Sequence, residues 1–510
     1  MQKKRDTKAA AKKATDDAKK DKKSDIKVVQ TSSKGGVLVD HLVPQAQNFQ
    51  VIDDNGRNLS CYLMWSDIKN NHNKYYISQA LLDNTGKHYL WTRYGRVGLD
   101  GVGSNIFCGG KDQLIREYDK KYRQKTGKGY TEVKMALGNP NQAVKADLAK
   151  KEEVKGKDGK SDGPKSKLDS AVQELLSFIF DMNLIEQSVV QIGYDVKRLP
   201  LGQLDKETVL EGYKYLREIE QVLNGKKKGD LADLSSKFYT YIPHNFSMKH
   251  MKNFTINTIE ILKQKIDLIQ NLIDIKVAHK IVNPKKPTKN AKHPLDEKYE
   301  ALNCDLKTVD HKSEEMKMVE QYLAHTSDGR TLKLLDLFKV VRGGEDKTFN
   351  PNKLSNKKLL WHGSRFSNFG GILSQGLRIA PPEAPKTGYL FGKGVYFADL
   401  AGKSAPYCCA NLSNNVGLFL LCEVAVGKPR PLYQTDQDAD NLPKGFDCTQ
   451  CIGRKIPNPA ESKTIEKDIE VPYGKLITNP DKGAQREHNE FVVYNTNQIR
   501  MKYLCKVQFN

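Results

Sequence analysis

The sequence lacks the apolar features of membrane and secreted proteins. No apolar run among its 510 residues approaches the roughly 20 residues that a bilayer-spanning helix needs. The lysine-rich N-terminus has no apolar stretch of the kind found in a secretory signal. The nine cysteines are scattered rather than arranged as a disulfide framework. We therefore expect a protein of a reducing compartment that has no membrane segment.

Negative charge is scarce relative to positive charge. Lys and Arg number 83 against 61 Asp and Glu, which gives a net charge of +22. Such an excess favours polyanionic partners, because neutralised phosphates release counterions on binding. Nucleic acid is therefore the leading partner class, although lysine-rich segments also serve solubility.

Changes in composition divide the chain into six segments. Residues 1–36 hold twelve Lys or Arg, five Asp and no aromatic residue, which predicts a disordered basic tail. Nuclear targeting with weak DNA attraction and simple solvation both remain open as its role. Polar stretches with Lys, Gly and Pro predict linkers at 139–167 and 284–292. The remaining segments predict folded domains at 37–138, 168–283 and 293–510.

Each predicted domain has its own hydrophobic pattern. Residues 37–138 contain aromatic runs such as HYLWTRYGRVG between DNTG and LDGVG turns, which predicts a small antiparallel sheet with a helix over 112–122. Residues 168–283 repeat apolar positions at spacings of three and four, which predicts an all-α bundle. Short runs such as GLFLLCEVAV predict a mainly β domain over 293–510. We therefore expect a multidomain α+β fold.

One stretch, residues 360–407, has the composition of a pocket lining. LWHGSRFSNFGGILSQGLRIAPPEAPKTGYLFGKGVYFADLAGKSAPY alternates glycine-bearing turns with aromatic and polar residues and holds few charges. Its HGSR segment places His362 beside the bare backbone of Gly363, and GKGVYFAD presents Tyr396 on a short strand. Downstream, Glu490 begins the apolar strand of NEFVVY, where a carboxylate needs partners.

These motifs closely resemble the donor-site signature of poly(ADP-ribose) polymerases, with His362, Tyr396 and Glu490 as the family's His-Tyr-Glu triad. WTRYGRVG resembles the core of that family's WGR DNA-binding module. NLIDIKVAHKIV resembles the last helix of its helical regulatory domain. The resemblance covers roughly residues 48–510. It implies a WGR domain, an autoinhibitory helical domain and an ADP-ribosyltransferase fold for the three predicted domains.

The resemblance also implies a role for each site residue toward NAD⁺. His362 would bind the adenosine ribose, while Gly363 and Ser404 would hold the nicotinamide carboxamide. Glu490 would bind the 2′-hydroxyl of the nicotinamide ribose and polarise the incoming acceptor hydroxyl. The other donor-site positions are the rings that would flank the nicotinamide, Tyr396 and Tyr407, together with Ser364, Arg378, Tyr389 and Lys403.

These residue types suit the implied reaction. Departing nicotinamide already carries positive charge, so its departure needs no general acid. The ribose develops oxocarbenium character, which a neighbouring carboxylate stabilises and which aromatic walls shield from water. The acceptor oxygen gains nucleophilicity as its proton is drawn away.

The WGR-like motif departs from the family at one position, because Tyr94 stands where the family has tryptophan. In the family this aromatic lies against the exposed sugar or base at a DNA break. We therefore expect Arg93, Tyr94 and Arg96 to contact DNA, with Lys74 nearby, although the smaller ring could weaken end binding. The resemblance further implies that the helical domain obstructs NAD⁺ binding until DNA loosens it, with residues 272–277 on the switching surface.

The implied function is DNA-break-stimulated poly(ADP-ribose) synthesis in the nucleus, on acceptor proteins that include the enzyme itself. An accessory factor that completes the acceptor site is a further expected partner. Two alternatives stay open: mono(ADP-ribosyl) transfer by the same architecture, and a DNA-end-binding scaffold without activity. Cys448 and Cys451 form an isolated C-x-x-C without a second ligand pair at useful spacing, so no metal is expected.

Overall fold

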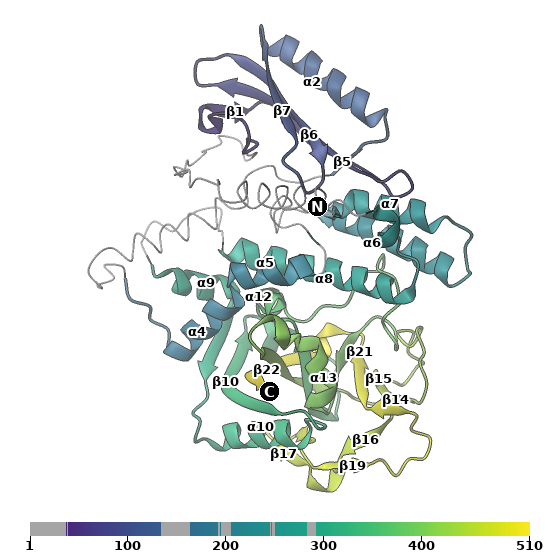
Figure 1. The fold of residues 1–510 in the computed structure, drawn as a ribbon. Coiled ribbons are helices and arrows are strands. Elements are labelled where there is room, and N and C mark those ends of the chain that lie inside the picture. The colour runs from purple at the N-terminus through teal and green to yellow at the C-terminus, as the bar shows by residue number, and fades with distance from the viewer. Residues whose placement is uncertain are drawn as a thin grey trace, which may run out of the picture.

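The computed structural model describes residues 37, 39–133, 164–191, 194, 206–244, 246, 250–282 and 292–510. The predicted tail, 1–36, and most of both predicted linkers lie outside these residues. Figure 1 shows three parts stacked in chain order, with a helical layer between a small sheet and a larger β-rich part. Within the described ranges, no helix is both long and apolar enough to span a bilayer.

The N-terminal part is an antiparallel sheet with one long helix packed across it. The elements are η1 (Ala46–Asn48), β1 (Phe49–Val51), β2 (Asp53–Asp54), β3 (Arg57–Asn58), β4 (Ser60–Asp67), β5 (His72–Asp83), β6 (His88–Arg96), β7 (Val102–Cys108), α2 (Lys111–Thr126) and β8 (Thr131–Glu132). The strand order is β7-β6-β5-β4-β8, and β1 pairs with β5. Leu114 and Tyr118 of α2 pack in one cluster with Tyr76 and Leu90 of the sheet. The helix predicted over 112–122 is confirmed and extends further at both ends.

The middle part is a helical bundle, as its apolar spacing predicts. Its elements are α4 (Ser170–Ile179), α5 (Met182–Gln191), α6 (Lys206–Leu223), α7 (Leu231–Tyr241), η2 (Met251–Phe254) and α8 (Ile259–Val282). Two helices begin at an aspartate, because the side chains of Asp169 and Asp230 accept hydrogen bonds from the first free backbone N–H groups. Leu262, Ile266 and Ile269, which recur at spacings of three and four along α8, are buried in the core.

The C-terminal part is mainly β, with short helices between its strands. Its helices are α9 (Pro294–Leu302), α10 (Glu314–His325), α11 (Glu345–Thr348), η3 (Phe366–Asn368), α12 (Phe369–Gln375), α13 (Ala401–Cys408), η4 (Ala410–Leu412), η5 (Pro459–Glu461) and η6 (Thr496–Gln498). Its strands are β9 (Cys304–Thr308), β10 (Leu332–Arg342), β11 (Lys357–Ser364), β12 (Val395–Phe397), β13 (Val416–Ala425), β14 (Pro429–Leu432), β15 (Cys448–Cys451), β16 (Gly453–Pro457), β17 (Lys463–Ile465), β18 (Ile469–Val471), β19 (Leu476–Thr478), β20 (Arg486–His488), β21 (Glu490–Val493) and β22 (Ile499–Phe509).

Two sheets of this part meet where the chain leaves β12. The larger sheet has the order β17-β18-β11-β13-β22-β10-β9, and the smaller one has the order β12-β21-β15-β14. Trp361 of β11 and Ala398 exchange backbone hydrogen bonds of 2.8 and 3.0 Å. This pair holds the end of β11 beside the end of β12, which brings the two sequence motifs of the predicted pocket together.

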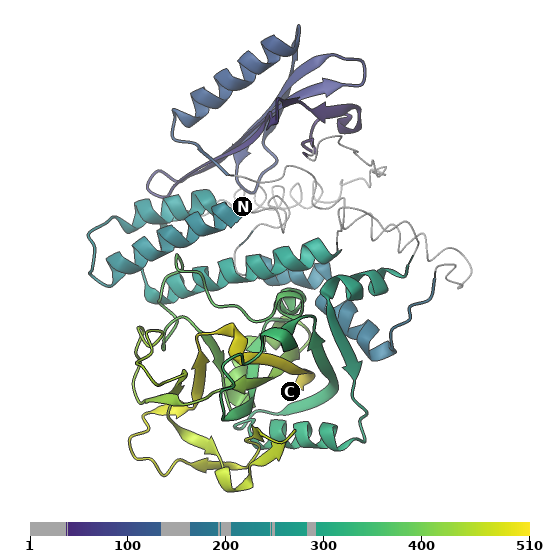
Figure 2. The same ribbon diagram turned by 180° about the vertical axis from the view of Figure 1, so that it is seen from behind.

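The helical part is hydrogen-bonded to the N-terminal sheet and packs on the C-terminal part. The backbone N–H of Ser66 donates to Thr240 Oγ1 at 3.2 Å, and that of Ile68 donates to Ser236 Oγ at 2.9 Å. These bonds join β4 and the residue that follows its end to α7. On the opposite side α8 packs against η3 and α12. Figure 2 shows the same order from behind, with the helices between the two β-rich parts.

Candidate active site

Eight of the ten residues expected at the NAD⁺ site line one cavity of the C-terminal part. They come from β11, the loop before β12, β12 itself, α13 and β21, which are far apart in the sequence. The cavity has a volume of about 220 Å³. The eight residues are His362, Gly363, Tyr389, Tyr396, Lys403, Ser404, Tyr407 and Glu490.

β11 brings an imidazole and a bare backbone to the cavity. His362 Nδ1–H donates to the carbonyl oxygen of Tyr396 at 2.9 Å, because a carbonyl can only accept. Burial lowers the pKa of His362, so at neutral pH the uncharged ring presents Nε2 as an acceptor. A Cβ added at Gly363 would lie 2.2 Å from the carbonyl oxygen of Ser404. Any side chain at this position would therefore push α13 away from β11.

Two tyrosines form an aromatic wall of the cavity. The Tyr396 hydroxyl donates to the Gly392 carbonyl at 2.8 Å and accepts from the Phe391 N–H at 3.0 Å. Its ring centroid lies 6.3 Å from that of Tyr389. Burial, reinforced by the charge of Asp267, raises the pKa of Tyr389 to about 12. Burial also raises the pKa of Tyr396, so both phenols are neutral at physiological pH.

α13 supplies three cavity residues, Lys403, Ser404 and Tyr407, within about 100° of one another around the helix axis. The Ser404 hydroxyl donates to the carbonyl oxygen of Trp361 at 3.3 Å. The Tyr407 side chain is 58% exposed, so its ring face is open to a stacking ligand. The short helix thus combines a cation, a hydroxyl and an aromatic surface.

Glu490 is the buried carboxylate of the site. It begins β21, pairs with Cys451 of β15 and is 7% exposed. Its Oε1 lies 3.0 Å from Lys403 Nζ. A carboxylate removed from water needs a charge partner, and this ion pair supplies one. The carboxylate at the start of an apolar strand is therefore accounted for.

Ser364 and Arg378, the other two expected NAD⁺ residues, do not line the cavity. Ser364 Oγ accepts from Asn368 Nδ2 at 3.1 Å, and the same amide donates to Asn271 Oδ1 of α8 at 3.0 Å. Arg378 forms an ion pair with Asp274 of α8. In this conformation both residues are engaged with the helical part.

The cavity has a further wall, which the sequence did not single out. It consists of Lys263, Ile266 and Asp267 of α8. These residues lie about one to three turns before the expected switching segment, 272–277. Burial raises the pKa of Asp267. The available signal was a carboxylate directly after Ile266, one of the regularly spaced apolar residues of this helix. Charged side chains are rarely buried, so one beside the apolar face of a helix marks a position to examine.

The groups around the cavity fit ADP-ribosyl transfer. A neutral imidazole and an unobstructed backbone can hold polar groups of NAD⁺, and the carboxylate can stabilise a ribose that develops positive charge. The aromatic walls limit access of water. The cavity volume of about 220 Å³ is below the ~300–1,000 Å³ usual for pockets that hold larger ligands, and α8 forms one wall. The residues expected to act in the transfer thus share one cavity, and α8 forms part of its wall.

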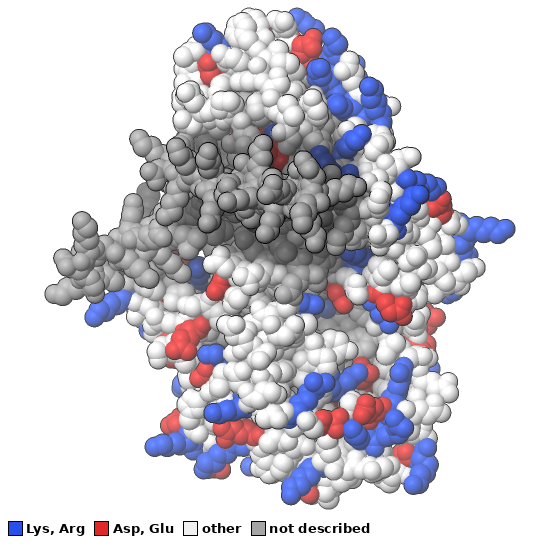
Figure 3. All heavy atoms as spheres, viewed as in Figure 1, with Lys and Arg blue, Asp and Glu red and all other residues white. Residues whose placement is uncertain are grey.

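The residues expected to contact DNA do not form one uniform surface. Tyr94 is 51% exposed, and Lys125 Nζ lies 5.7 Å from its ring centroid. Arg96 is half-buried and donates to the carbonyl oxygen of Asn71 at 2.9 Å. Lys74 is also half-buried. Figure 3 shows Lys and Arg side chains along the flank of α2, which gives this end of the molecule a basic edge.

Arg93 does not belong to that surface, which corrects the expectation that it contacts DNA. Its side chain is buried, with Nη2 2.8 Å and Nε 2.9 Å from Asp40 Oδ2. Its Nη1 donates to the Tyr75 hydroxyl at 2.8 Å. A guanidinium held by a buried carboxylate and a phenol is not available to a phosphate. Arg93 instead fastens the segment around Asp40 to the sheet.

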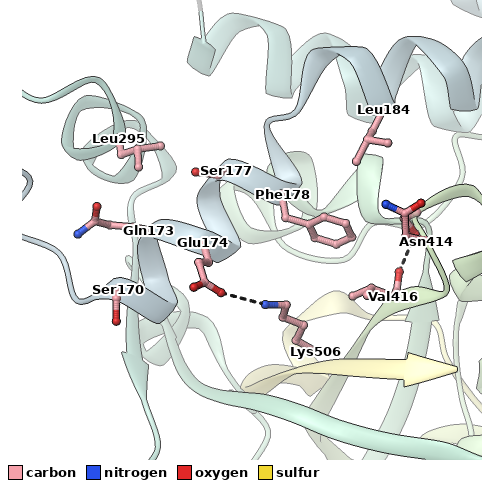
Figure 4. Close-up of a pocket in the computed structure, with 11 residues that line it drawn as sticks. Ser170, Gln173, Glu174, Ser177, Phe178, Leu184, Leu295, Asn414, Val416 and Lys506 are labelled. Carbon is pink, nitrogen blue, oxygen red and sulfur yellow. Dashed lines mark hydrogen bonds and ion pairs between the residues drawn. The ribbon is translucent and has the colours of Figure 1, made fainter. Parts of the chain in front are cut away.

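A second hollow, of about 550 Å³, opens where α4 faces β22 (Figure 4). Phe178 and Leu184 supply part of its apolar lining, and Glu174 lies 3.5 Å from Lys506. None of the residues expected at the NAD⁺ site lines it. This hollow is therefore separate from the candidate active site.

One cluster among the described residues, Asp328, Glu487 and His488, has the donor types of a metal site. His488 Nε2 lies 2.7 Å from Asp328 Oδ2. Lys455 Nζ lies 3.0 Å from both Asp328 Oδ1 and Glu487 Oε1. The ammonium group pairs with both carboxylates, and His488 contacts one of them, so the cluster is accounted for as an ion-pair network.

Three sequence profiles match this chain in succession. Residues 59–136 match the WGR domain, 166–299 the poly(ADP-ribose) polymerase regulatory domain and 313–509 the poly(ADP-ribose) polymerase catalytic domain. NAD⁺ is the substrate of this catalytic domain. The profiles thus agree with the small sheet, the helical part and the β-rich part of the structure.

Individual relatives extend this similarity over most of the chain. Poly [ADP-ribose] polymerase 2 of Homo sapiens is 40% identical, over 87% of this chain and 78% of the relative. Poly [ADP-ribose] polymerase 2 of Arabidopsis thaliana is 37% identical, over 94% of this chain and 78% of the relative. Poly [ADP-ribose] polymerase 1 of Gallus gallus is 37% identical, over 95% of this chain but 48% of the relative. With its three matched domains and its cavity geometry, this chain belongs to the poly(ADP-ribose) polymerase family.

Proposed function

We propose that this enzyme transfers ADP-ribose from NAD⁺ to proteins, itself included, in response to DNA breaks, and that it extends the product to poly(ADP-ribose). The observation that carries the proposal is the convergence of His362, Tyr396 and Glu490 on one cavity. The net charge of +22 supports action on DNA in the nucleus. The proposed domain limits are 37–138, 168–283 and 293–510.

The cavity walls suggest how NAD⁺ would be held. His362 Nε2 would accept a hydrogen bond from the adenosine ribose, since Nδ1 already donates to Tyr396. The Gly363 backbone and the Ser404 hydroxyl would bind the nicotinamide carboxamide. Tyr407 would stack on the nicotinamide ring, with Tyr396 on its other side.

Glu490 would act on the sugar between the leaving group and the acceptor. The bond from ribose C1′ to nicotinamide nitrogen breaks, and its electron pair leaves with nicotinamide. The acceptor oxygen forms the new bond to C1′, and its proton passes to the carboxylate. Lys403, 3.0 Å from Glu490, would keep that carboxylate oriented toward the ribose. No metal takes part in this proposal.

The helical domain would hold the enzyme in a low-activity state. Asp267 lines the cavity, and Asp274 pairs with Arg378, so α8 engages both the substrate space and an expected substrate contact. DNA binding at Tyr94, Arg96 and the basic flank of α2 would favour a conformation in which α8 withdraws. An accessory factor would complete the acceptor site.

The test is incubation of the full-length protein with labelled NAD⁺, with and without 5′-phosphorylated nicked DNA. We expect a DNA-dependent ladder of polymer on a denaturing gel. Glu490→Ala should reduce polymer formation by about 10²–10³-fold, the usual cost of losing a group that stabilises transition-state charge. Glu487→Ala is the matched control, because its side chain lies outside the cavity and is 56% exposed.

Each result has a distinct meaning. A single discrete band would indicate mono(ADP-ribosyl) transfer. An equal ladder with and without DNA would contradict DNA stimulation. Full activity in Glu490→Ala would contradict the assigned role of this carboxylate. No labelling under either condition would favour a DNA-end-binding scaffold.

A further inference from the structure

An asparagine and an aspartate form a buried pair directly behind the cavity. Asn489 immediately precedes Glu490, and Asp399 lies two residues before the start of α13. Asn489 Nδ2 donates to Asp399 Oδ2 at 2.7 Å. The side chains are 6% and 5% exposed, and neither lines the cavity. The pair therefore does not contact a ligand bound there.

The Asn489 amide is bound at both ends. While Nδ2 donates to Asp399, Oδ1 accepts from the Gly453 N–H at 2.8 Å. Gly453 begins β16, so one side chain joins three segments: the start of β21, the approach to α13 and the start of β16. An amide engaged by a donor and by an acceptor has a defined orientation.

The backbone at Gly453 makes this arrangement rigid. A Cβ added there would lie 2.1 Å from the carbonyl carbon of His488 and 2.4 Å from the nitrogen of Asn489. β16 thus packs directly on the peptide that leads into Glu490. The strand start has little room to shift while both hydrogen bonds of Asn489 are made.

The segments that this pair joins are the ones that carry Glu490 and Lys403. Their 3.0 Å ion pair crosses from β21 to α13, and the Asn489–Asp399 bond crosses between the same two segments. Two parallel connections fix both the separation and the rotation of the segments.

A buried pair of this kind is not a general stabiliser. Removing a carboxylate from water is costly, and apolar residues of similar size often serve stability as well or better. Asp399 Oδ1 has no hydrogen-bond partner within the described part of the chain. The pair is therefore better explained by the orientation that it imposes on the two segments than by a contribution to stability.

We propose that Asn489 and Asp399 are positioning residues for the transfer reaction, which hold Glu490 at the ribose without touching NAD⁺. The inference rests on the role proposed for Glu490. A carboxylate displaced by about 1 Å can lose ~10²-fold in rate, because it no longer meets the charge that develops in the transition state.

The experiment measures kcat and KM for NAD⁺ in the full-length enzyme at saturating nicked DNA. Asn489→Ala should lower kcat by about 10–100-fold and change KM by less than about threefold, since the binding walls remain. Asn479→Ala is the matched control. Asn479 Nδ2 also bonds to Gly453, at 2.8 Å to its carbonyl oxygen, but Asn479 does not bond to Asp399. Its kcat should stay within about twofold of the wild type.

An exchange of the two side chains separates positioning from packing. Asn489→Asp alone places two carboxylates together and should be as impaired as Asn489→Ala. The double variant Asp399→Asn/Asn489→Asp again has an amide N–H facing a carboxylate oxygen, and an oxygen remains to accept from Gly453. It should recover kcat to within about fivefold of the wild type. Asp399→Asn keeps an acceptor for Asn489 and should be the least impaired of the single variants.

Several results would overturn the proposal. A kcat of Asn489→Ala within twofold of the wild type would do so, as would a rise in KM without a fall in kcat. Failure of the exchanged pair to recover activity, in a protein that melts as a folded enzyme, would assign the loss to packing. If Asn489→Ala does not fold, the same decision follows from comparing the kcat of Asn489→Asp with that of the exchanged pair.

A different result would concern Glu490 itself. Normal activity of Glu490→Ala would remove the basis of the inference together with the proposed function. An inactive Glu490→Ala beside a fully active Asn489→Ala would reject the positioning pair alone.

Discussion

At the residue scale, Asp267 is the α8 carboxylate that lines the cavity. It lines the cavity beside Tyr389 and Tyr407, and burial raises its pKa. An ionised carboxylate at this place would repel the negative charge of a dinucleotide, and its side chain occupies part of the space in either protonation state. Its position suggests that α8 obstructs the site through charge as well as volume.

Asp267→Ala should therefore increase activity in the absence of DNA. Removal of a repulsive carboxylate worth ~1–2 kcal/mol would raise the basal rate by about 5–30-fold. The measurement is NAD⁺ consumption without DNA, and Asp233→Ala, an exposed α7 carboxylate, is the control. A basal rate equal to that of the wild type would mean that Asp267 does not contribute to inhibition.

The raised pKa of Asp399 predicts how this buried carboxyl group makes stability depend on pH. Burial raises its pKa from 3.8 to about 6, although Asn489 and the charge of Lys358 act in the opposite direction. Between these two values the folded state binds more protons than the unfolded state. The contribution of Asp399 to the free energy of unfolding therefore decreases as pH rises through this window, by up to about 3 kcal/mol.

Asp399→Asn removes that ionisation and should show the effect as a difference in melting temperature. The Tm of the variant minus that of the wild type should be small near pH 4.5 and should increase toward pH 7.5. Comparing the two proteins at each pH cancels the titration of the other carboxylates. A difference that is constant, or that falls with pH, would contradict the raised pKa.

At the element scale, α7 and β4 form the seam between the WGR domain and the helical domain. The Ser236 and Thr240 hydroxyls each donate to a carbonyl of α7, at 2.7 and 2.9 Å. The same oxygens accept from the backbone N–H groups of Ile68, directly after β4, and of Ser66 within it. Because both hydroxyls use their donor and an acceptor position, the seam is specific in geometry.

Ser236→Ala combined with Thr240→Val should weaken communication across this seam. The buried backbone N–H groups of Ser66 and Ile68 would lose their acceptors, at a cost of about 1–3 kcal/mol each. We expect unchanged DNA affinity by fluorescence anisotropy but a several-fold lower stimulation of activity by DNA. Lys237→Ala, on the exposed side of α7, is the control. If DNA stimulates the double variant as strongly as the wild type, these bonds do not transmit the effect of DNA binding.

The elements themselves were largely predictable, since each depends on local periodicity. The apolar spacing within α4 and α8 predicted a helical bundle, and the short apolar run GLFLLCEVAV predicted β13. Contacts between elements were not predictable in the same way. The carboxylate of Glu220 on α6 accepts from the Thr387 N–H in the loop before β12. No pattern in the sequence near either residue predicts this contact.

At the scale of the whole molecule, polar contacts run from the WGR domain to α8. Asn73 Nδ2 of β5 donates to the carbonyl oxygen of His244 at 2.9 Å, and Lys265 Nζ of α8 lies 3.0 Å from His244 Nε2. Lys265 is two residues from Asp267 of the cavity wall. The helical domain thus contacts the DNA-binding module on one side and the substrate site on the other.

Whole-molecule charge predicts the salt dependence of DNA binding. The logarithm of the association constant for nicked DNA should fall linearly with the logarithm of KCl concentration, because bound phosphates release counterions. Lys74→Ala should reduce the magnitude of this slope by about one if Lys74 meets a phosphate. Lys463→Ala, on β17 of the catalytic domain, should leave the slope unchanged. An unaltered slope in Lys74→Ala would remove that residue from the DNA surface.

The sequence by itself determined the family, the order of domains and the identity of the cavity residues that come from the C-terminal motifs. These follow from contiguous motifs and from local periodicity, which depend on residues near one another in the chain. Tertiary structure alone decided that Arg93 is buried with Asp40 and that α8 reaches the cavity through Asp267. It also decided that Asn489 meets Asp399 behind Glu490. Such contacts join residues far apart in sequence, and only the packing of separate elements brings them within hydrogen-bonding distance.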